Sequence, residues 1–511
     1  MAPESTPSPL PQDLASAHQL ITTLHQELSK SRNEIALLRH KLDALCRKLF
    51  GKKTEKVSPD QLALAFEQLA NETAAPSEPV ETDSGESPTK ERRRKPTGRR
   101  PIPANLPRQI VVQDVTEDQK RCACCGGTKV KIGEDVSEKI DYVPASVVVR
   151  QTVTPKYACP RCHEGVTSAP AAPQAVERGL AAEGLLAYVT ISKFQDHLPL
   201  FRLERILLRH GIDVSRSTLC GWVADVAQAL EPIYAHLRKL IVTCDYLQTD
   251  DTPVTVLTES NGSFKGRLWT YLDPLGKQVV FEATRTHERD GPVNFLSTFR
   301  GYLQADAYSG YDAVYRGGRI VEVGCWAHAR RRFVEALDTD PHAATILVLV
   351  KQLFRIDEET ASLSPDDRLR ARREASLPVL AEIDRIRAEL ARRTLPKSPL
   401  GEALRYLDNQ RQALGRYLDD PRLKLDNNGA ERQLRAIAVG RKNWLFAGSM
   451  NGAHRAAILY TLVHCCQLAG VDPFAYFRDV LLRVATHPMS AIDQLTPKGW
   501  AQTIAPTLVA A

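Results

Sequence analysis

Two aspartates stand at the same place in a phrase that the chain contains twice. Tyr-Leu-Gln-x-Asp ends once at Asp250 and again at Asp306, each time at the end of an apolar run. Turn-forming residues follow both copies, so each run reads as a β-strand that presents a carboxylate at the edge of a sheet. Carboxylates on neighbouring strands could hold two metal ions about 4 Å apart for phosphoryl transfer. The alternative is two unrelated strand ends with solvated carboxylates.

The segments around these aspartates predict an α/β core over residues 240–450. Three antiparallel strands, a short helix near Val293–Phe299 and two further strands follow the order of a ribonuclease-H-like fold. A large helical, Arg-rich insertion occupies about residues 334–424, and residues 451–511 read as a C-terminal helical segment.

A third acid is expected on a helix after the last strand of such a core. Glu431 occupies this place, in the first turns of a predicted helix that Asp426 or Asn427 could cap. The alternative is that Glu431 forms only a surface ion pair with Arg435, four residues further on.

Cations and an aromatic ring come together after this helix, at Arg441, Lys442 and Trp444. Such a group suits contact with a distorted DNA end, because bases stack on rings and cations attract phosphates. In an earlier segment, His328 and Arg331 are candidates for electrostatic help to the acids, and Arg331 also for DNA contact. A structural capping role explains both residues equally well.

Four cysteines form two Cys-x-x-Cys pairs, Cys122 with Cys125 and Cys159 with Cys162. Four thiolates close a structural Zn²⁺ site, and strand-like residues between the pairs predict a zinc-ribbon-like module over residues 108–170. Cys124 or His163 could replace one ligand. A redox pair is the alternative, although redox sites carry one such motif rather than two.

Apolar residues recur at seven-residue spacing from Leu14 to Leu49, with a companion series three residues on. This pattern predicts a leucine-zipper coiled coil over residues 10–56, and therefore a homo-oligomer or a helical partner. A single amphipathic surface helix is the alternative. Residues 71–107 lack periodic apolar residues and read as a flexible basic linker. Its basic run, which would attract DNA by counterion release, comprises Arg92, Arg93, Arg94 and Lys95.

Residues 180–235 read as a helical connector. An amphipathic stretch, Leu198–His210, ends at Gly211, and Ser215 offers an N-cap for the next helix. Helix, short turn and helix are the outline of a DNA-binding helix-turn-helix and, equally, of an ordinary helix pair.

The composition is that of a globular protein of 511 residues, with 43% hydrophobic residues and a net charge of +7. This length predicts several domains. The chain start lacks a signal-peptide pattern and no apolar stretch approaches the ~18 residues of a membrane span, so we expect a cytoplasmic protein without a membrane partner. Most of the eleven cysteines lie outside Cys-x-x-Cys pairs, and the paired four favour metal over disulfides.

The chain resembles the insertion sequence 66 family of bacterial transposases over nearly all of its length. The resemblance implies a zipper, a zinc-binding DNA module and a DDE core whose acids, binding Mg²⁺ or Mn²⁺, fall on Asp250, Asp306 and Glu431. Asp251 departs from the family, which commonly has Glu there, so two adjacent carboxylates compete for the metal role. The segments that carry the resemblance are Leu49–Lys56, Gly133–Pro144, Tyr157–Cys162, Thr249–Val254, Cys325–Phe333 and Asp426–Ser449.

This resemblance implies a DNA transposase that binds the terminal inverted repeats of its element and target DNA, and that cuts and joins strands. Small accessory proteins of the same element are further candidate partners. One alternative is a metal-dependent nuclease on the same fold. The other is a DNA-binding regulator with zipper and zinc module but an inactive core.

Overall fold

The computed structural model describes residues 147–153, 156–157, 167–168, 176, 180–260 and 262–503. The predicted coiled coil, the basic linker with its run from Arg92 to Lys95, and the four cysteines of the zinc module lie outside the described residues. Within the range predicted for that module, two short strands pair in antiparallel orientation. They are β1 (Lys156–Tyr157) and β2 (Thr167–Ser168).

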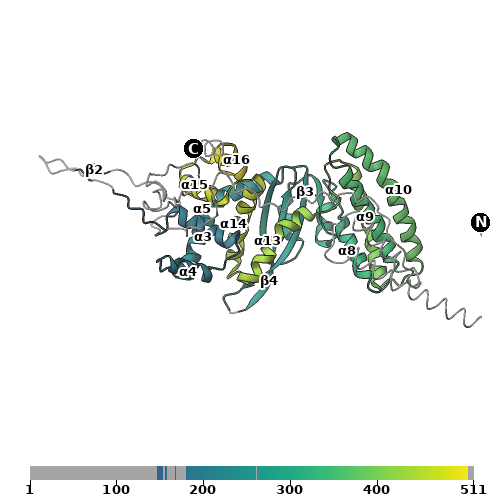
Figure 1. Cartoon of the computed structure of the whole chain (residues 1–511), viewed down its shortest axis with the longest axis horizontal. Coiled ribbons are helices and arrows are strands. Elements are labelled where there is room, and N and C mark those ends of the chain that lie inside the picture. Colours follow the sequence, from purple (N-terminus) through teal and green to yellow (C-terminus); the bar gives the residue numbers. More distant parts are fainter. Residues whose placement is uncertain are drawn as a thin grey trace, which may run out of the picture. The chain divides into compact units, whose positions relative to one another are not determined.

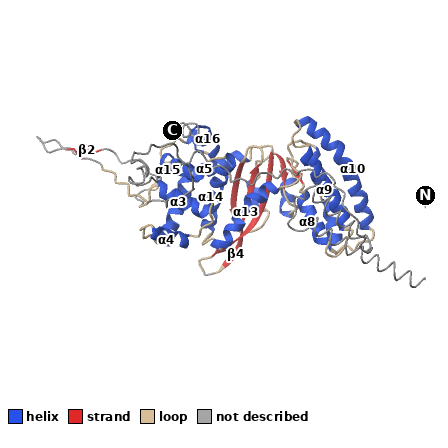
Figure 2. Ribbon diagram, viewed as in Figure 1, coloured by secondary structure: helices blue, strands red, loops and turns tan. Residues whose placement is uncertain are grey.

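A five-stranded sheet lies at the centre of the described residues, in the order β5-β4-β3-β6-β7 (Figure 2). The first three strands along the chain are antiparallel neighbours, whereas β6 and β7 run parallel to β3. Parallel strands need crossover connections, and short helices supply them here. The elements are β3 (Tyr246–Leu257), β4 (Ser263–Asp273), β5 (Gln278–Thr284), α6 (Asp290–Phe295), β6 (Gly301–Gln304), η1 (Ser309–Tyr311), α7 (Asp312–Tyr315) and β7 (Ile320–Val323).

The short helix expected near Val293–Phe299 begins earlier, at Asp290, and ends at Phe295. Its end is fixed by packing rather than by local signals, because Phe295 stacks on Tyr271 of β4 with ring centroids 3.7 Å apart.

The first hydrophobic core joins the sheet to helices from both ends of the described chain. Helix α14 lies along the outer edge of β5, where Thr461 Oγ1 accepts from the Phe281 N–H (2.9 Å) and the Cys465 thiol donates to the Val279 carbonyl (3.2 Å). Covering this edge removes a row of unpaired backbone groups. The helices of this core are α3 (Glu183–Phe194), α4 (Leu200–Arg209), α5 (Arg216–Ile241), α14 (Met450–Ala469), α15 (Pro473–Arg483), η3 (Met489–Leu495) and α16 (Pro497–Thr503).

The helix pair expected in the connector is present. Helix α4 ends before Gly211, whose φ is 81°, and Ser215 Oγ caps α5 by accepting from the Thr218 N–H (3.2 Å). Helix α5 continues to Ile241 and packs against β5 and α14.

The second core is built by the helices between β7 and α13. The fully buried Arg372 donates to the Leu423 carbonyl (3.0 Å) and pairs with Asp357. One arginine therefore joins two helices to the segment that precedes α13. Helix α13 then crosses β3 and β4 (Figure 1). The elements are α8 (Trp326–Ala336), α9 (Ala343–Glu359), α10 (Pro365–Ala391), α11 (Pro399–Asn409), α12 (Arg411–Gly415), η2 (Arg416–Leu418) and α13 (Asn428–Trp444).

In the part of the chain that the structure describes, no helix combines the length and the apolar character needed to cross a membrane.

Candidate active site

The two copies of the repeated phrase lie side by side. Strands β3 and β6 pair in parallel with Tyr246 opposite Tyr302 and Gln248 opposite Gln304. The copies are therefore in register, and the aspartate of each copy follows two residues after a paired glutamine. The strand neighbourhood that the repeat predicted is present, but the expectation that both copies end a strand is wrong for the first copy. Strand β3 continues through Asp250 to Leu257 because it pairs with β4, whereas β6 ends at Gln304, before Asp306.

The paired glutamines tie both strands to the segment that precedes α13. Gln248 Nε2 donates to Gln304 Oε1 (2.9 Å) and to the Asp426 carbonyl (2.8 Å). Gln304 Nε2 donates to the carbonyls of Gly324 (3.0 Å) and Lys424 (2.8 Å). Because both glutamines are buried, a lost partner would leave a costly unpaired polar group. The network therefore fixes where α13 begins.

Helix α13 places the third acid within electrostatic range of Asp250. Asp426 Oδ1 accepts from the Asn428 N–H (3.1 Å) and so caps the helix. Asn427 occupies the N-cap position without a capping hydrogen bond from its side chain, because its amide donates to the Thr249 carbonyl of β3 (3.2 Å). Glu431 lies in the first turn, so three carboxylates come from β3, the end of β6 and the start of α13.

Negative charge is concentrated where these elements meet. Burial raises the pKa of Asp250 to about 7, although the Asp251 N–H donates to its Oδ1 (2.8 Å), and repulsion from Asp306 and Glu431 adds to the rise. Burial also raises the pKa of Asp306, and nearby His328 opposes that rise. A site with these properties attracts cations.

Glu431 faces α8 rather than Arg435. Its Oε1 lies 3.4 Å from His328 Nε2 and 3.5 Å from Arg331 Nη2, yet this buried oxygen accepts no hydrogen bond from the described residues. Burial and the charge of Arg331 lower the pKa of His328 to about 4. The imidazole is therefore neutral at neutral pH, and Arg331 is the charged partner of Glu431.

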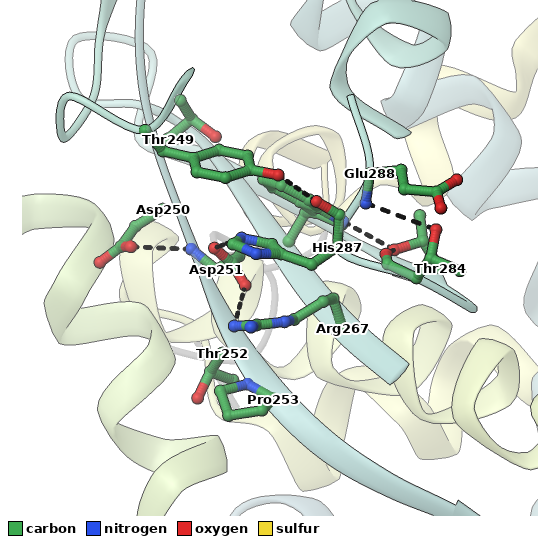
Figure 3. A network of polar contacts seen from close by, with 12 residues as sticks. Thr249, Asp250, Asp251, Thr252, Pro253, Arg267, Thr284, His287 and Glu288 are labelled. Atoms are coloured by element: carbon green, nitrogen blue, oxygen red, sulfur yellow. Dashed lines mark hydrogen bonds and ion pairs between the residues drawn. The ribbon is translucent and has the colours of Figure 1, made fainter. Parts of the chain in front are cut away.

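Asp251 points to the other side of β3 from Asp250 (Figure 3). Its Oδ2 accepts from Arg267 (2.8 Å), and its Oδ1 lies 3.0 Å from Nε2 of His287, which stacks on Tyr308 with centroids 4.1 Å apart. Alternation of side chains along a strand produces this divergence. The two adjacent carboxylates therefore do not share partners.

The donor set suits a divalent cation. Carboxylate oxygens are the hard ligands that Mg²⁺ and Mn²⁺ prefer. Burial raises the pKa values of Asp250 and Asp306, and Glu431 Oε1 accepts no hydrogen bond from the described residues although Arg331 lies 3.5 Å from it. Among the described residues, no three His, Cys, Asp or Glu side chains are gathered closely enough to hold a metal ion. The oxygen ligands and negative charge of the three carboxylates therefore suit a divalent cation, although Glu431 faces α8.

The residues expected to contact DNA differ in their surroundings. Arg441 Nη1 donates to Thr252 Oγ1 (2.7 Å) and to the Pro253 carbonyl (2.6 Å), so it joins α13 to β3. Trp444 is half-buried against the first core, whereas Lys442 is exposed. Arg331 has a side chain that is 56% exposed and contacts Glu431 at the same time.

Sequence reasoning did not assign a role to Gln248, Gln304 or Gly429, which position the acids. The glutamines were visible as constant members of the repeat. Gly429 has no such signal, since its importance comes from contact with residues distant in the chain. A Cβ at Gly429 would overlap Gln248 Oε1 and lie 2.9 Å from Leu272 Cδ2.

Replacing Gly429 by alanine should therefore force the start of α13 away from β3. We expect the free energy of unfolding to fall by about 1–3 kcal/mol, as for other overpacked sites, and DNA cleavage to fall with it because Glu431 moves. Denaturant unfolding measures the effect. Gly184→Ala in α3, where the added Cβ meets no atom within 4 Å, is the matched control and should be neutral or stabilising. Equal stability of the two variants would contradict the close packing.

Four family models match the chain. Residues 178–455 match "Transposase IS66 family" and residues 461–498 match "IS66 C-terminal element". Residues 37–111 match "Transposase C of IS166 homeodomain", and residues 119–163 match "zinc-finger binding domain of transposase IS66". The last range includes all four cysteines of the two pairs.

Proteins of Sinorhizobium fredii resemble the chain over nearly its whole length. "Uncharacterized protein y4hP" is 33% identical over 514 residues, which cover 93% of this chain and 91% of that protein. "Uncharacterized protein y4jD" is 30% identical over 516 residues, covering 96% and 97%. Since one family model spans more than half of the chain and the relatives align almost end to end, the chain belongs to the transposase family of insertion sequence 66.

Proposed function

We propose that this transposase cuts DNA at the ends of its element and joins them to target DNA, with Asp250, Asp306 and Glu431 as catalytic carboxylates. The observation that carries the proposal is the in-register pairing of the Tyr-Leu-Gln residues of the two copies, after which Asp250 follows within β3 and Asp306 follows just beyond the end of β6. The buried glutamines then connect both strands to the helix that carries Glu431.

The proposal includes a ribonuclease-H-like core. Its support is the sheet, in which three antiparallel strands are extended on the far side of β3 by two parallel strands. The third acid on α13, after the helical insertion, agrees with that assignment. Domain limits near residues 240 and 450 remain part of the proposal.

The side chains of the site have separate roles in this reaction. Bound by the three carboxylates, Mg²⁺ or Mn²⁺ would activate the attacking hydroxyl and stabilise the leaving oxygen. Asp250, whose pKa burial raises to about 7, would hold the cation in its deprotonated form. Neutral His328 and charged Arg331 hold the Glu431 carboxylate on the α8 side. Arg331 is exposed enough to contact a phosphate as well.

The remaining parts of the chain would bind DNA and mediate self-association. We assign structural Zn²⁺ to the four paired cysteines, which the matched zinc-finger range supports. DNA contacts are assigned to the linker run from Arg92 to Lys95 and to Lys442, and self-association to the coiled coil over residues 10–56. Element ends, target DNA and accessory proteins of the element are the proposed partners.

A joining assay tests the function. The purified chain is incubated in Mg²⁺ or Mn²⁺ with a labelled duplex from one end of the element and a circular plasmid as target. We expect nicked duplex and, in addition, labelled plasmid in which the end has been joined. Cleavage without joined product would identify a nuclease. Binding without either product would identify a regulator with an inactive core.

A further inference from the structure

Two apolar side chains at the C-terminal end of α13 are exposed to solvent. Leu445 is 65% exposed and Phe446 is 46% exposed. Leu445 also has a φ of 64°, in the left-handed region where side chains other than those of Gly and Asn are uncommon. Glycine or asparagine would adopt this backbone conformation with less strain. The apolar pair is therefore available for contact with a ligand.

The backbone on both sides of this pair is fixed. The Leu445 N–H donates to the Arg441 carbonyl (2.8 Å), and Ala447 exchanges two backbone hydrogen bonds with β3, of 2.8 and 2.9 Å. Strand β3 is the strand that carries Asp250. The exposed pair is thus held in a defined place relative to the acids rather than on a loose loop.

A stripe of cations leads from the acids to this pair. Arg432, Arg435 and Lys442 are exposed on α13, and their spacing of three and seven residues places them on one face. None of the three forms an ion pair or a hydrogen bond with any residue that the structure describes. A helix rises 1.5 Å per residue, so the stripe extends about 20 Å from Glu431, or roughly six base steps of DNA.

We propose that this face of α13, from Arg432 to Phe446, is a track for the DNA end. Its cations follow the phosphate backbone, and Phe446 stacks on a base that is unpaired about six steps from the cleaved bond. Exposed cations on one helix face attract a row of anions, which a phosphate backbone supplies. The exposed aromatic is Phe446 and not Trp444, which packs against the core. This inference rests on the proposed function, because it takes the acid site as one end of the track.

Binding to paired and unpaired ends tests the stacking. Full-length protein is titrated without divalent metal into two fluorescent duplexes from the element terminus, one fully paired and one with a short unpaired stretch. We expect the parent to prefer the unpaired duplex. Phe446→Ala should lower that preference about tenfold, the order of one base–aromatic stack, and Phe446→Trp should restore it. Phe474→Ala, at an exposed phenylalanine of α15, should behave as the parent.

Salt dependence tests the cations. Arg435→Gln and Lys442→Gln should each reduce the slope of log affinity against log salt by about one, the effect of one lost phosphate contact. Arg355→Gln on α9, where Arg355 pairs with Glu359 at 3.6 Å, removes an equal charge away from the track and should leave the slope unchanged.

Two outcomes would overturn the track. One is an unchanged preference in Phe446→Ala. The other is a change in sedimentation with unchanged DNA binding, which would assign the face to a second copy of the chain. Because these measurements contain no divalent metal, they are separate from the joining assay. A parent that prefers unpaired ends but neither cuts nor joins would contradict the proposed function and leave the track standing.

Discussion

Replacing any one of Asp250, Asp306 and Glu431 by its amide should abolish DNA cleavage and joining, with a loss of at least about a thousandfold. Each amide keeps the shape of the side chain and removes one negative charge from a site that must bind divalent cations. DNA binding should persist, because it rests on basic segments and the cysteine module rather than on the acids. The measurement is the joining assay, run beside a binding titration for each variant.

Asp251→Asn is the matched control for this series. It removes the same charge one residue away, but from a side chain that points away from Asp250 and pairs with Arg267 and His287. Activity should stay within about tenfold of the parent, because asparagine keeps an oxygen that can accept from Arg267 and the side chain lies on the other side of β3 from Asp250 (Figure 3). An inactive Asp251→Asn beside an active Asp250→Asn would mean that the acids are assigned one residue out of register. Normal cutting by all three amides would place the chemistry elsewhere.

The contribution of Asp250 to the stability of the metal-free protein should fall as the pH rises from about 4 to about 7, and Asp250→Asn should remove this contribution. Burial and repulsion raise the folded-state pKa of Asp250 to about 7, whereas an unfolded chain has an Asp pKa near 3.9. In this window the folded state holds a proton that the unfolded state has released, so the free energy of unfolding falls with rising pH. The full shift corresponds to about 4 kcal/mol, reduced by the solvent that reaches this half-buried side chain. The raised pKa of Asp306 acts in the same direction, whereas the lowered pKa of His328 acts in the opposite direction, so the comparison with Asp250→Asn isolates the Asp250 carboxyl.

Thermal unfolding at pH 4 and at pH 8, with chelator present, measures this effect. Asp250→Asn and the parent should have similar midpoints at pH 4, and the variant should be the more stable at pH 8. Adding Mg²⁺ at pH 8 should stabilise the parent by mass action and leave Asp250→Asn nearly unchanged. If the unfolding midpoints of the two proteins changed with pH in the same way, the pKa of Asp250 would not be raised in the folded protein.

The repeat carried most of the information that the sequence held about the site. A phrase with the same residues at the same spacing predicts two strands that can pair in register, and Gln248 and Gln304 do pair. Glu431 could be located because it follows a capping residue, Asp426, at the start of an amphipathic helix. Both predictions depend on interactions between residues that are close in the chain or identical in pattern.

Other features depend on contacts between distant segments and could not be read in advance. Whether Trp444 or Phe446 is exposed is decided by what packs beside α13, including Tyr460 of α14 and His197. The turn of Glu431 toward His328 depends on α8, which is separated from α13 by the whole helical insertion. No local spacing encodes either result. The coiled coil and zinc predictions fall outside the described residues and stay predictions.

One amide group connects the beginning and the end of the helical insertion. Gln304 Nε2 reaches the carbonyl of Gly324, where the chain leaves the sheet, and that of Lys424, where it returns. The two ends also meet through the backbone, where the Gly324 N–H donates to the Ala413 carbonyl and the Trp326 N–H donates to the Leu425 carbonyl, each at 2.9 Å. Because both ends are anchored beside the sheet and loop-closure entropy changes only slowly with length, we expect that the helices beyond α8 can be lengthened, shortened or replaced while the three acids keep their places. New DNA-handling properties could be acquired there without disturbing the chemistry.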